Sequence, residues 1–251
     1  MPDYLPIWLI LAVIAPAIGS FIGVLIIRLP EGRAVVASRS VCEHCGHVLG
    51  PHDLIPLASW LWLRGKCRYC GAKIGTLYPA IELAALAVVA WAATQTSGEV
   101  LMASCLLGWA LLAVAVVDWR SYLVPDALSL FLLLTGFAAA FAFDPLRFSD
   151  HVLGAGAGVL LFAFLAWGYQ ALRGHEGLGF GDAKLLGGLG AWVAWQGLPS
   201  IILFGASLGL SAVLVRSLTG ARLKATDRVP FGLFLAAAGW LVWLYGPLSF
   251  F

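Results

Sequence analysis

The chain has 251 residues, of which 61% are hydrophobic and 11% are charged, and its mean hydropathy is +0.94. This composition excludes a water-soluble globular protein and is typical of a polytopic membrane protein surrounded by lipid. The formal net charge of +2 is too small to indicate a nucleic-acid partner. We therefore expect an all-α fold, a transmembrane bundle of about eight helices.

The first apolar stretch, residues 5–27, is long enough to cross a hydrocarbon core of about 30 Å. It has no basic n-region and no small-residue cleavage site, so we interpret it as a retained helix and not as a signal peptide. A polar segment, residues 28–75, follows it. The further apolar stretches are residues 77–95, 100–117, 123–143, 151–172, 183–199, 200–216 and 231–248, which gives eight spans. The predicted parts are a first helix (1–30), a small insert (31–76) and a helical core (77–251).

The basic residues predict the topology. If the first helix runs from outside to inside, fourteen of the fifteen Lys and Arg residues fall in inner segments, and only Arg147 falls outside. This asymmetry follows the positive-inside rule. It places both termini outside, and it places the insert, Asp118 and Asp182 at the inner, cytoplasmic face.

The insert contains two Cys-x-x-Cys pairs, Cys42 with Cys45 and Cys67 with Cys70, separated by 21 residues and each followed by a glycine. Two thiolates from each of two tight turns complete a tetrahedral zinc site with no open position, so we expect structural zinc. The alternatives are a dithiol redox site or two disulfides, and both suit an oxidising compartment better than the cytoplasmic face. Any one of three nearby histidines could replace a cysteine as ligand, but we interpret them as ordinary surface residues. They are His44, His47 and His52.

Asp182 lies in a glycine-rich turn, Gly177-Leu178-Gly179-Phe180-Gly181-Asp182-Ala183-Lys184, at the edge of an apolar helix. A carboxylate in this position often marks a functional site, and the glycines would let an extended peptide approach closely. The simpler interpretation is a loop in which Asp182 caps the next helix.

Asp118 ends the third apolar stretch, and Pro125 is well placed to start the next helix. The alternatives for Asp118 are an ion pair with Arg120 or a side chain that reaches the lipid interface. Asp126 is comfortable near a helix N-terminus and needs no catalytic role.

Asp118 and Asp182 together supply what an aspartic protease requires, one ionised and one protonated carboxyl group. Two carboxylates about 4 Å apart at an effective dielectric constant near 20 repel each other by roughly 4 kcal/mol, so the pair should share one proton near neutral pH. A helix C-terminus disfavours negative charge and a helix N-terminus favours it. We therefore expect the charge on Asp182 and the proton on Asp118.

The chain resembles the type IV prepilin peptidases, bifunctional inner-membrane aspartic proteases. The resemblance covers nearly all of the sequence and rests on several motifs besides the two cysteine pairs. They are Gly19-Ser20-Phe21 with Arg28-Leu29-Pro30, Leu63-Arg64-Gly65-Lys66-Cys67, Tyr78-Pro79-Ala80-Ile81-Glu82, the segment from Asp118 to Pro125, Gly179-Phe180-Gly181-Asp182-Ala183-Lys184, and Pro230-Phe231-Gly232. The Gly-x-Gly-Asp element is shared with other intramembrane aspartic proteases.

The resemblance implies that Asp118 and Asp182 are the catalytic pair and that the four paired cysteines bind zinc. It implies a prepilin or pseudopilin substrate of a type IV pilus or type II secretion system, cut after the glycine that ends a short basic leader. It also implies methylation of the new N-terminus with S-adenosylmethionine, for which we find no Gly-rich fingerprint. The sequence departs from the family pattern at Gly23, Glu43 and Leu233, where Asn, Pro and Pro are usual.

Two alternatives stay open. Glu82 lies inside the second span near its inner end, and we favour a hydrogen bond within the bundle over contact with the substrate leader. The competing class of function is a non-enzymatic, zinc-stabilised carrier or assembly scaffold. A carrier should have charged residues at the bilayer midplane and related halves, whereas these carboxylates gather at one interface and no internal repeat is visible.

Overall fold

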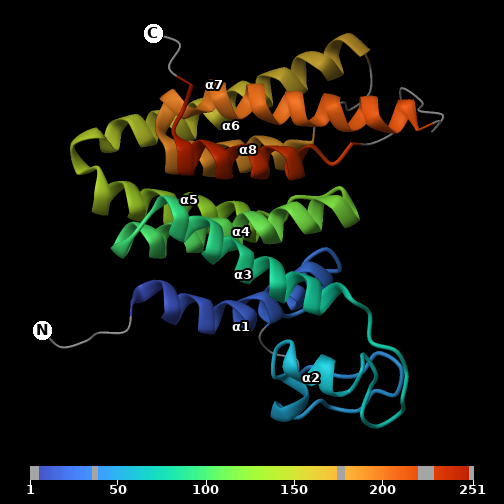
Figure 1. Ribbon diagram of the computed structural model, residues 1–251. Helices are drawn as coiled ribbons and strands as arrows, with labels where there is room; N and C mark the ends of the chain where they lie inside the picture. Colours follow the sequence, from blue (N-terminus) through green and yellow to red (C-terminus); the bar gives the residue numbers. More distant parts are fainter. Residues whose placement is uncertain (1–5, 36–38, 174–178, 220–228, 249–251) are drawn as a thin grey trace, which may run out of the picture. The chain divides into compact units, whose positions relative to one another are not determined.

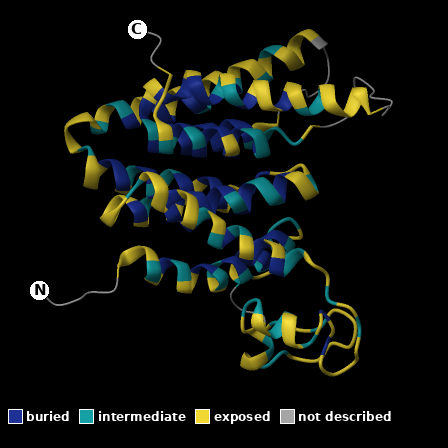
Figure 2. Ribbon diagram, in the orientation of Figure 1, coloured by how far each residue is buried: buried dark blue, intermediate teal, exposed yellow. Residues whose placement is uncertain are grey.

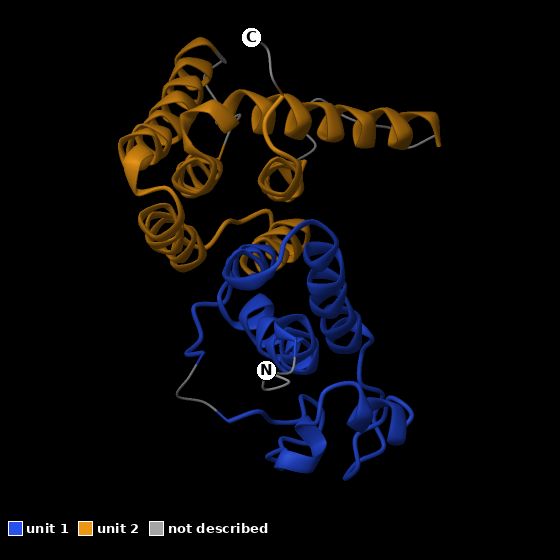
Figure 3. Ribbon diagram, turned by 60° about the vertical axis from the view of Figure 1, so that its left-hand side comes forward, with its two compact units in different colours: residues 1–109 blue, residues 110–251 orange. Residues whose placement is uncertain are grey.

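The computed structural model describes residues 6–35, 39–173, 179–219 and 229–248, and these residues are mostly helical (Figure 1). No β-strand is found among them, and the insert has only two isolated β-bridges, Val41 with Val48 and Lys66 with Lys73. The chain divides into two compact units, residues 1–109 and 110–251 (Figure 3). The expected all-α fold is confirmed.

Unit 1 is built on helices α1 (Ile7–Arg28) and α3 (Leu77–Gln95), followed by the first half of α4 (Gly98–Ser121). Helices α1 and α3 pack closely because α1 presents glycines to α3. A Cβ atom on Gly19 would lie 2.5 Å from the Cα atom of Glu82. In lipid, where helices gain little from hydrophobic burial, such small residues permit close backbone contact.

The insert contains a 3₁₀ helix (Pro51–Leu54) and the short helix α2 (Ala58–Trp62). Asp53 joins its parts, because its carboxylate accepts hydrogen bonds from the Gly50 backbone N–H (3.1 Å), Arg68 Nε (2.7 Å) and the Tyr69 hydroxyl (3.3 Å). Desolvation acts against the charged form, but the Gly50 N–H and the Arg68 guanidinium outweigh it and lower the pKa of Asp53.

Unit 2 contains the end of α4, then α5 (Asp126–Phe143), a 3₁₀ turn (Pro145–Arg147), α6 (Phe148–Arg173), α7 (Phe180–Leu218) and α8 (Phe231–Tyr245). The buried residues lie on the faces of these helices that turn toward one another (Figure 2). Helix α7 packs against α5, α6 and α8 and is the centre of the unit.

The 39-residue element α7 is two helices that meet at Ala194, whose backbone (φ 58°, ψ −179°) is not helical. The chain reverses its direction at Ala194, and two contacts with α8 show the direction of the second half. Ser200, early in this half, accepts a hydrogen bond through its hydroxyl from the Leu248 N–H, just beyond the end of α8. Gly209, later in this half, lies against Phe231 and Phe234 at the start of α8. The two predicted spans 183–199 and 200–216 therefore exist, but the predicted boundary beside Pro199 is wrong by about five residues.

Six of the helices are long and apolar enough to cross a membrane, and α8, with 15 residues, is a shorter apolar helix. Their outward side chains are large and hydrophobic. On α6, for example, Leu160 is 71% exposed, Phe164 65% and Trp167 67%. Exposed apolar surface of this extent suits contact with lipid and not with water, so this is a multi-pass membrane protein.

Helices α6 and α7 provide a test of glycine packing. A Cβ atom on Gly154 would lie 2.6 Å from the Gly190 carbonyl oxygen, whereas one on Gly156, also in α6, would meet nothing within 4 Å. We expect Gly154→Ala to destabilise the purified protein by about 1–3 kcal/mol through this overpacking. Gly156→Ala, the matched control, should leave the thermal unfolding midpoint in detergent equal or slightly higher. Equal midpoints for both variants would contradict the close contact.

Candidate active site and metal centre

Asp118 lies in the last turn of α4, which extends to Ser121 and so beyond the predicted end at residue 117. Its side chain is 4% exposed. The carboxylate oxygen Oδ2 accepts a hydrogen bond of 2.9 Å from the Leu233 N–H, and the Gly232 N–H also donates to this carboxylate. Asp118 is thus held by the first turn of α8 and has no need of Arg120 as a partner.

The two donors to Asp118 are backbone N–H groups that have no hydrogen-bond acceptor within α8. The first turn of any helix leaves such groups without an intrahelical acceptor, and the helix dipole makes this end attractive to negative charge. Gly232 has no side chain between the backbone and the carboxylate, since a Cβ atom there would lie 3.1 Å from Oδ2 of Asp118. The N-terminus of α8 therefore forms an anion site that Asp118 occupies.

Asp182 is the third residue of α7 and is 9% exposed. Gly179 precedes the helix and accepts a backbone hydrogen bond of 3.1 Å from the Asp182 N–H. Among the described residues, none donates a hydrogen bond to the Asp182 side chain, and the charged group that acts on it is Asp118. Gly177 and Leu178, which belong to the same motif, lie outside the described residues.

Val124 is the point where the elements carrying the two aspartates meet. Cβ atoms placed on Gly181 and on Gly232 would each lie 3.0 Å from an atom of the Val124 side chain. The start of α7 and the start of α8 therefore contact the same residue of the α4–α5 connection. Residues 118 and 182, 64 positions apart in the sequence, are thereby brought within electrostatic reach of each other.

The connection that carries Val124 begins with a left-handed residue. Tyr122 has φ 53°, and its N–H donates to the Asp118 carbonyl oxygen at 2.8 Å, which closes the end of α4. Asp126, the other carboxylate in this region, is 78% exposed and forms an ion pair of 2.6 Å with Lys184 of α7. This pair fastens α5 to α7 and leaves Asp126 outside the buried pair.

The four paired cysteines of the insert form one cluster. Their sulfur atoms all lie within 4.8 Å of one another, and Cys42 Sγ is 3.9 Å from Cys70 Sγ. None of the four is in a disulfide. Each pair sits in an equivalent turn, in which the glycine after the second cysteine has positive φ: 68° at Gly46 and 71° at Gly71. Glycine suits these two positions because it adopts positive φ without strain. Crowding is not the reason, since a Cβ atom at either position would meet nothing within 4 Å.

The cluster has the chemistry of a metal site. Backbone N–H groups of Cys45 and His44 lower the pKa of Cys42 to about 6. The pKa of Cys70 is raised to about 11, since desolvation and the three neighbouring thiols outweigh an N–H donor from Ala72. Four adjacent thiols cannot all ionise by themselves, whereas a bound cation stabilises four thiolates together. The four cysteines could therefore hold a metal ion.

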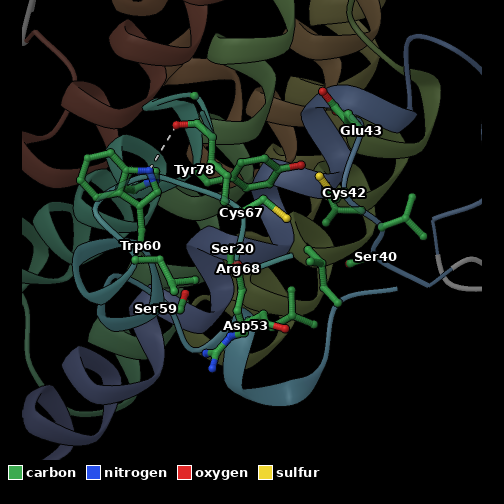
Figure 4. Close-up of a pocket in the computed structure, with 18 of the residues that line it drawn as sticks. Ser20, Ser40, Cys42, Glu43, Asp53, Ser59, Trp60, Cys67, Arg68 and Tyr78 are labelled. Atoms are coloured by element: carbon green, nitrogen blue, oxygen red, sulfur yellow. Dashed lines mark hydrogen bonds and ion pairs between the residues drawn. The ribbon is translucent and has the colours of Figure 1, made fainter. Parts of the chain in front are cut away.

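Unit 1 also contains a cavity of about 260 Å³ between the insert and helices α1 and α3 (Figure 4). Glu82, which is 5% exposed, lies in its wall, and its Oε2 accepts a hydrogen bond of 2.7 Å from the Leu57 N–H of the insert. The Ser20 side chain of α1 bonds to the same carboxylate. The structural role favoured for Glu82 is thus observed, whereas the cavity was not predicted from the sequence.

Two family descriptions match the chain. Residues 13–96 match the bacterial peptidase A24 N-terminal domain, and residues 105–214 match the type IV leader peptidase family. No solved structure shows a significant match.

Curated relatives agree with this. The chain is 39% identical to a prepilin leader peptidase/N-methyltransferase of Aeromonas hydrophila, over 91% of this chain and 87% of the relative. It is 41% identical to one of Burkholderia pseudomallei (87% and 71%) and 37% identical to one of Pseudomonas aeruginosa (91% and 87%). The chain belongs to the type IV leader peptidase family, and nothing in these comparisons supports the carrier or scaffold alternative.

Proposed function

We propose that this member of the type IV leader peptidase family is an intramembrane aspartic endopeptidase that uses Asp118 and Asp182. Its substrates are the precursors of type IV pilins or pseudopilins, from which it removes the short basic leader. Like the relatives it resembles, it also methylates the new N-terminal amine. The observation that supports the proposal is that Asp118 and Asp182 are both buried and that the backbone beside Asp182 and the helix end that holds Asp118 both pack against Val124.

The hydrogen bonds assign different roles to the two carboxylates. Asp118 receives two N–H donors and the positive end of the α8 dipole, so of the two carboxylates it is the better suited to hold the negative charge. Asp182 is buried and receives no donor from the described residues, so it is the better suited to hold the proton. This reverses the expectation from the sequence, which considered only the helix that each aspartate belongs to.

The assignment defines the peptidase step. Asp118 accepts a proton from a water molecule, whose oxygen attacks the carbonyl carbon of the scissile peptide. Asp182 donates a hydrogen bond to the carbonyl oxygen and stabilises the negative charge that develops there. The leaving nitrogen then takes from Asp118 the proton that came from the water molecule, and the C–N bond breaks, which returns Asp118 to its ionised form. The glycines beside Asp182 let the extended leader lie close to the carboxylates.

The proposed location is the bacterial inner membrane, with both termini periplasmic and with the insert and the aspartates cytoplasmic. This orientation rests on the distribution of Lys and Arg. Three of the basic residues in the count, Arg222, Lys224 and Arg228, lie outside the described residues. A prepilin has its cleavage site where its hydrophobic segment meets the cytoplasm, the side to which the aspartates are assigned.

The metal held by the insert is proposed to be structural zinc. Four thiolates at about 2.3 Å from Zn²⁺ fill a tetrahedral coordination sphere and leave no position for substrate. The sulfur atoms, all within 4.8 Å of one another, need only a small contraction to reach this geometry. The metal would hold the two cysteine turns together and take no part in the peptidase step.

Replacement of either aspartate tests the central claim. Asp118→Asn and Asp182→Asn should each lower prepilin cleavage in membranes by at least ~100-fold, the usual contribution of a general acid or base. Asp126→Asn is the matched control, because it breaks an exposed ion pair of small energy. It should keep cleavage within about twofold. Normal cleavage by a membrane-inserted Asp118→Asn or Asp182→Asn protein would remove that residue from the reaction.

Leu233 offers a test of the α8 donor. Leu233→Pro removes one N–H from Asp118 while Pro remains acceptable in the first turn of a helix. The loss of one hydrogen bond to a charged group, about 1.5–3 kcal/mol at most, should slow cleavage by roughly tenfold. Leu233→Ala keeps the N–H and should have a kcat close to that of the wild type. A kcat lowered equally in both variants would assign the effect to the leucine side chain.

The zinc proposal is tested by metal analysis of the purified protein. We expect one zinc per chain, and we expect Cys45→Ala to lose most of it because three thiolates bind far more weakly than four. Cys105→Ala is the control, since Cys105 is buried in α4 and is not part of the cluster. A full zinc content in the Cys45→Ala protein would show that the metal, if any, is held elsewhere.

A further inference from the structure

We propose that residues 54–63 of the insert lie in the membrane leaflet at the inner end of α1, and that they bind anionic phospholipid together with the two basic residues that follow them. The inference goes beyond the proposed function, because neither the aspartates nor the metal site requires the insert to touch lipid. It rests on the composition of this apolar run, on its depth beside α1 and α3, and on the side chains and charges that it exposes.

The apolar run interrupts a polar insert. Its ten residues carry no charge and include four leucines, an isoleucine and two tryptophans. Several of the large side chains are nevertheless exposed: Leu54 by 42%, Ile55 by 48%, Leu61 by 66% and Trp62 by 89%. Exposed apolar surface of this kind marks contact with a membrane or with another protein.

A hydrogen bond at Leu57 fixes the depth at which the run reaches the helices. The Leu57 N–H donates to the Glu82 carboxylate of α3 at 2.7 Å, and the Ser20 side chain of α1 bonds to the same carboxylate. Ser20 is eight residues before Arg28, the last residue of α1, and so lies about 12 Å from that end along the helix axis. Leu57 therefore lies beside the membrane-spanning part of α1.

A second hydrogen bond fixes the other end of α2. Trp60 lines the cavity, and its Nε1 donates to the Ile74 carbonyl oxygen at 3.4 Å (Figure 4). Ile74 is only three residues before Leu77, where α3 begins. The 22 residues of α1 span about 33 Å, close to the thickness of a hydrocarbon core. Helix α2 therefore lies between a level inside the bilayer and the level at which hydrocarbon meets the headgroups.

Lipid is the partner that this depth favours. Phe21 of α1 and Leu83 of α3 lie at the depth of the Leu57 hydrogen bond, and they are 49% and 55% exposed. Leu61 and Trp62 extend this apolar, lipid-facing surface onto the insert. Tryptophan is enriched where hydrocarbon meets the headgroups, because its ring is apolar and its N–H is polar. A protein partner would have to displace lipid to reach these side chains.

The charges beside the run favour anionic lipid. Arg64 and Lys66 follow it directly and are exposed, and within the part of the chain that the structure describes neither forms an ion pair. Asp53, which precedes the run, is paired with Arg68. The insert as a whole, residues 31–76, has six basic and three acidic residues. Lys and Arg at this level are attracted to a negatively charged lipid surface.

The depth of position 62 tests the proposal in the full-length protein, in nanodiscs of phosphatidylcholine and phosphatidylglycerol. p-Acetylphenylalanine in place of Trp62 carries a nitroxide through its ketone, which leaves the cysteines unmodified. Power-saturation EPR with oxygen and a nickel chelate then measures the depth of the label. We expect it about 5–10 Å below the lipid phosphates, the depth of an interfacial apolar segment.

Two other positions calibrate the measurement. The same label in place of Leu83 should lie in the bilayer, and in place of Tyr69, an exposed aromatic residue of the second cysteine turn, it should lie in water. A label as accessible to the nickel chelate at position 62 as at 69 would overturn the proposal. A label shielded from both reagents would assign the cover to protein and would overturn it too.

Position 61 gives an independent measurement if the label at position 62 prevents folding. Leu61 is 66% exposed on the same helix, so the label should reach the same range of depth. Metal content and the thermal unfolding midpoint verify that the insert of each labelled protein is folded. A water-exposed label at position 61 in a folded protein would overturn the proposal.

A double variant, Arg64→Gln with Lys66→Gln, tests the lipid charge. In the wild-type background the label at position 62 should lie deeper when phosphatidylglycerol is present than in phosphatidylcholine alone, because the two cations are drawn to the anionic surface. The double variant should lose this difference. Arg147→Gln, the control, removes an exposed cation from the turn between α5 and α6 and should keep it. Equal depths in both lipids without these substitutions would overturn the preference for anionic lipid.

Discussion

The contact between Asp118 and the first turn of α8 is the interaction on which the candidate active site of unit 2 depends. A carboxylate with 4% exposure inside a membrane protein needs donors, and two backbone N–H groups provide them. Because α8 must start at this point to supply them, its position is coupled to the position of Asp118. Gly232 makes the coupling possible, since any side chain there would intrude between the helix end and the carboxylate.

Much of the fold could be predicted because hydrophobic length is a strong signal in membranes. The stretches that became α1, α3, α5 and α6 were located to within a few residues. The break in α7 was misplaced because Pro199 is the visible helix breaker, whereas the chain reverses at Ala194, where a non-glycine residue has positive φ. Helix α6 packs closely against this point, since a Cβ atom on Gly154 would lie 2.6 Å from the Ala194 carbonyl carbon and 2.7 Å from the Trp195 nitrogen. No local preference of the sequence records such a contact.

For the metal centre and the aspartate pair, residue type and spacing identified the side chains but not the residues that surround them. The pairing and the glycines of the cysteine motifs determine two equivalent turns, so the cluster of Cys42, Cys45, Cys67 and Cys70 was predictable. The hydrogen-bond partners of Asp118 were not, because they belong to a helix more than 110 residues after Asp118 in the chain. The dipole of the helix that contains a residue is visible in a sequence, but that of a neighbouring helix is not.

Contacts in the structure explain two of the positions at which the sequence departs from the family pattern. At Gly23, where the pattern has Asn, the Tyr78 ring fills the space a side chain would need, so glycine permits an aromatic contact between α1 and α3. At Leu233, where the pattern has Pro, the N–H that Pro would lack binds Asp118 at 2.9 Å. One change shapes the wall of the cavity in unit 1, and the other adds a donor to the carboxylate in unit 2. The two departures thus act on different parts of the molecule, one on the packing of α1 against α3 and the other on the carboxylate held by the start of α8.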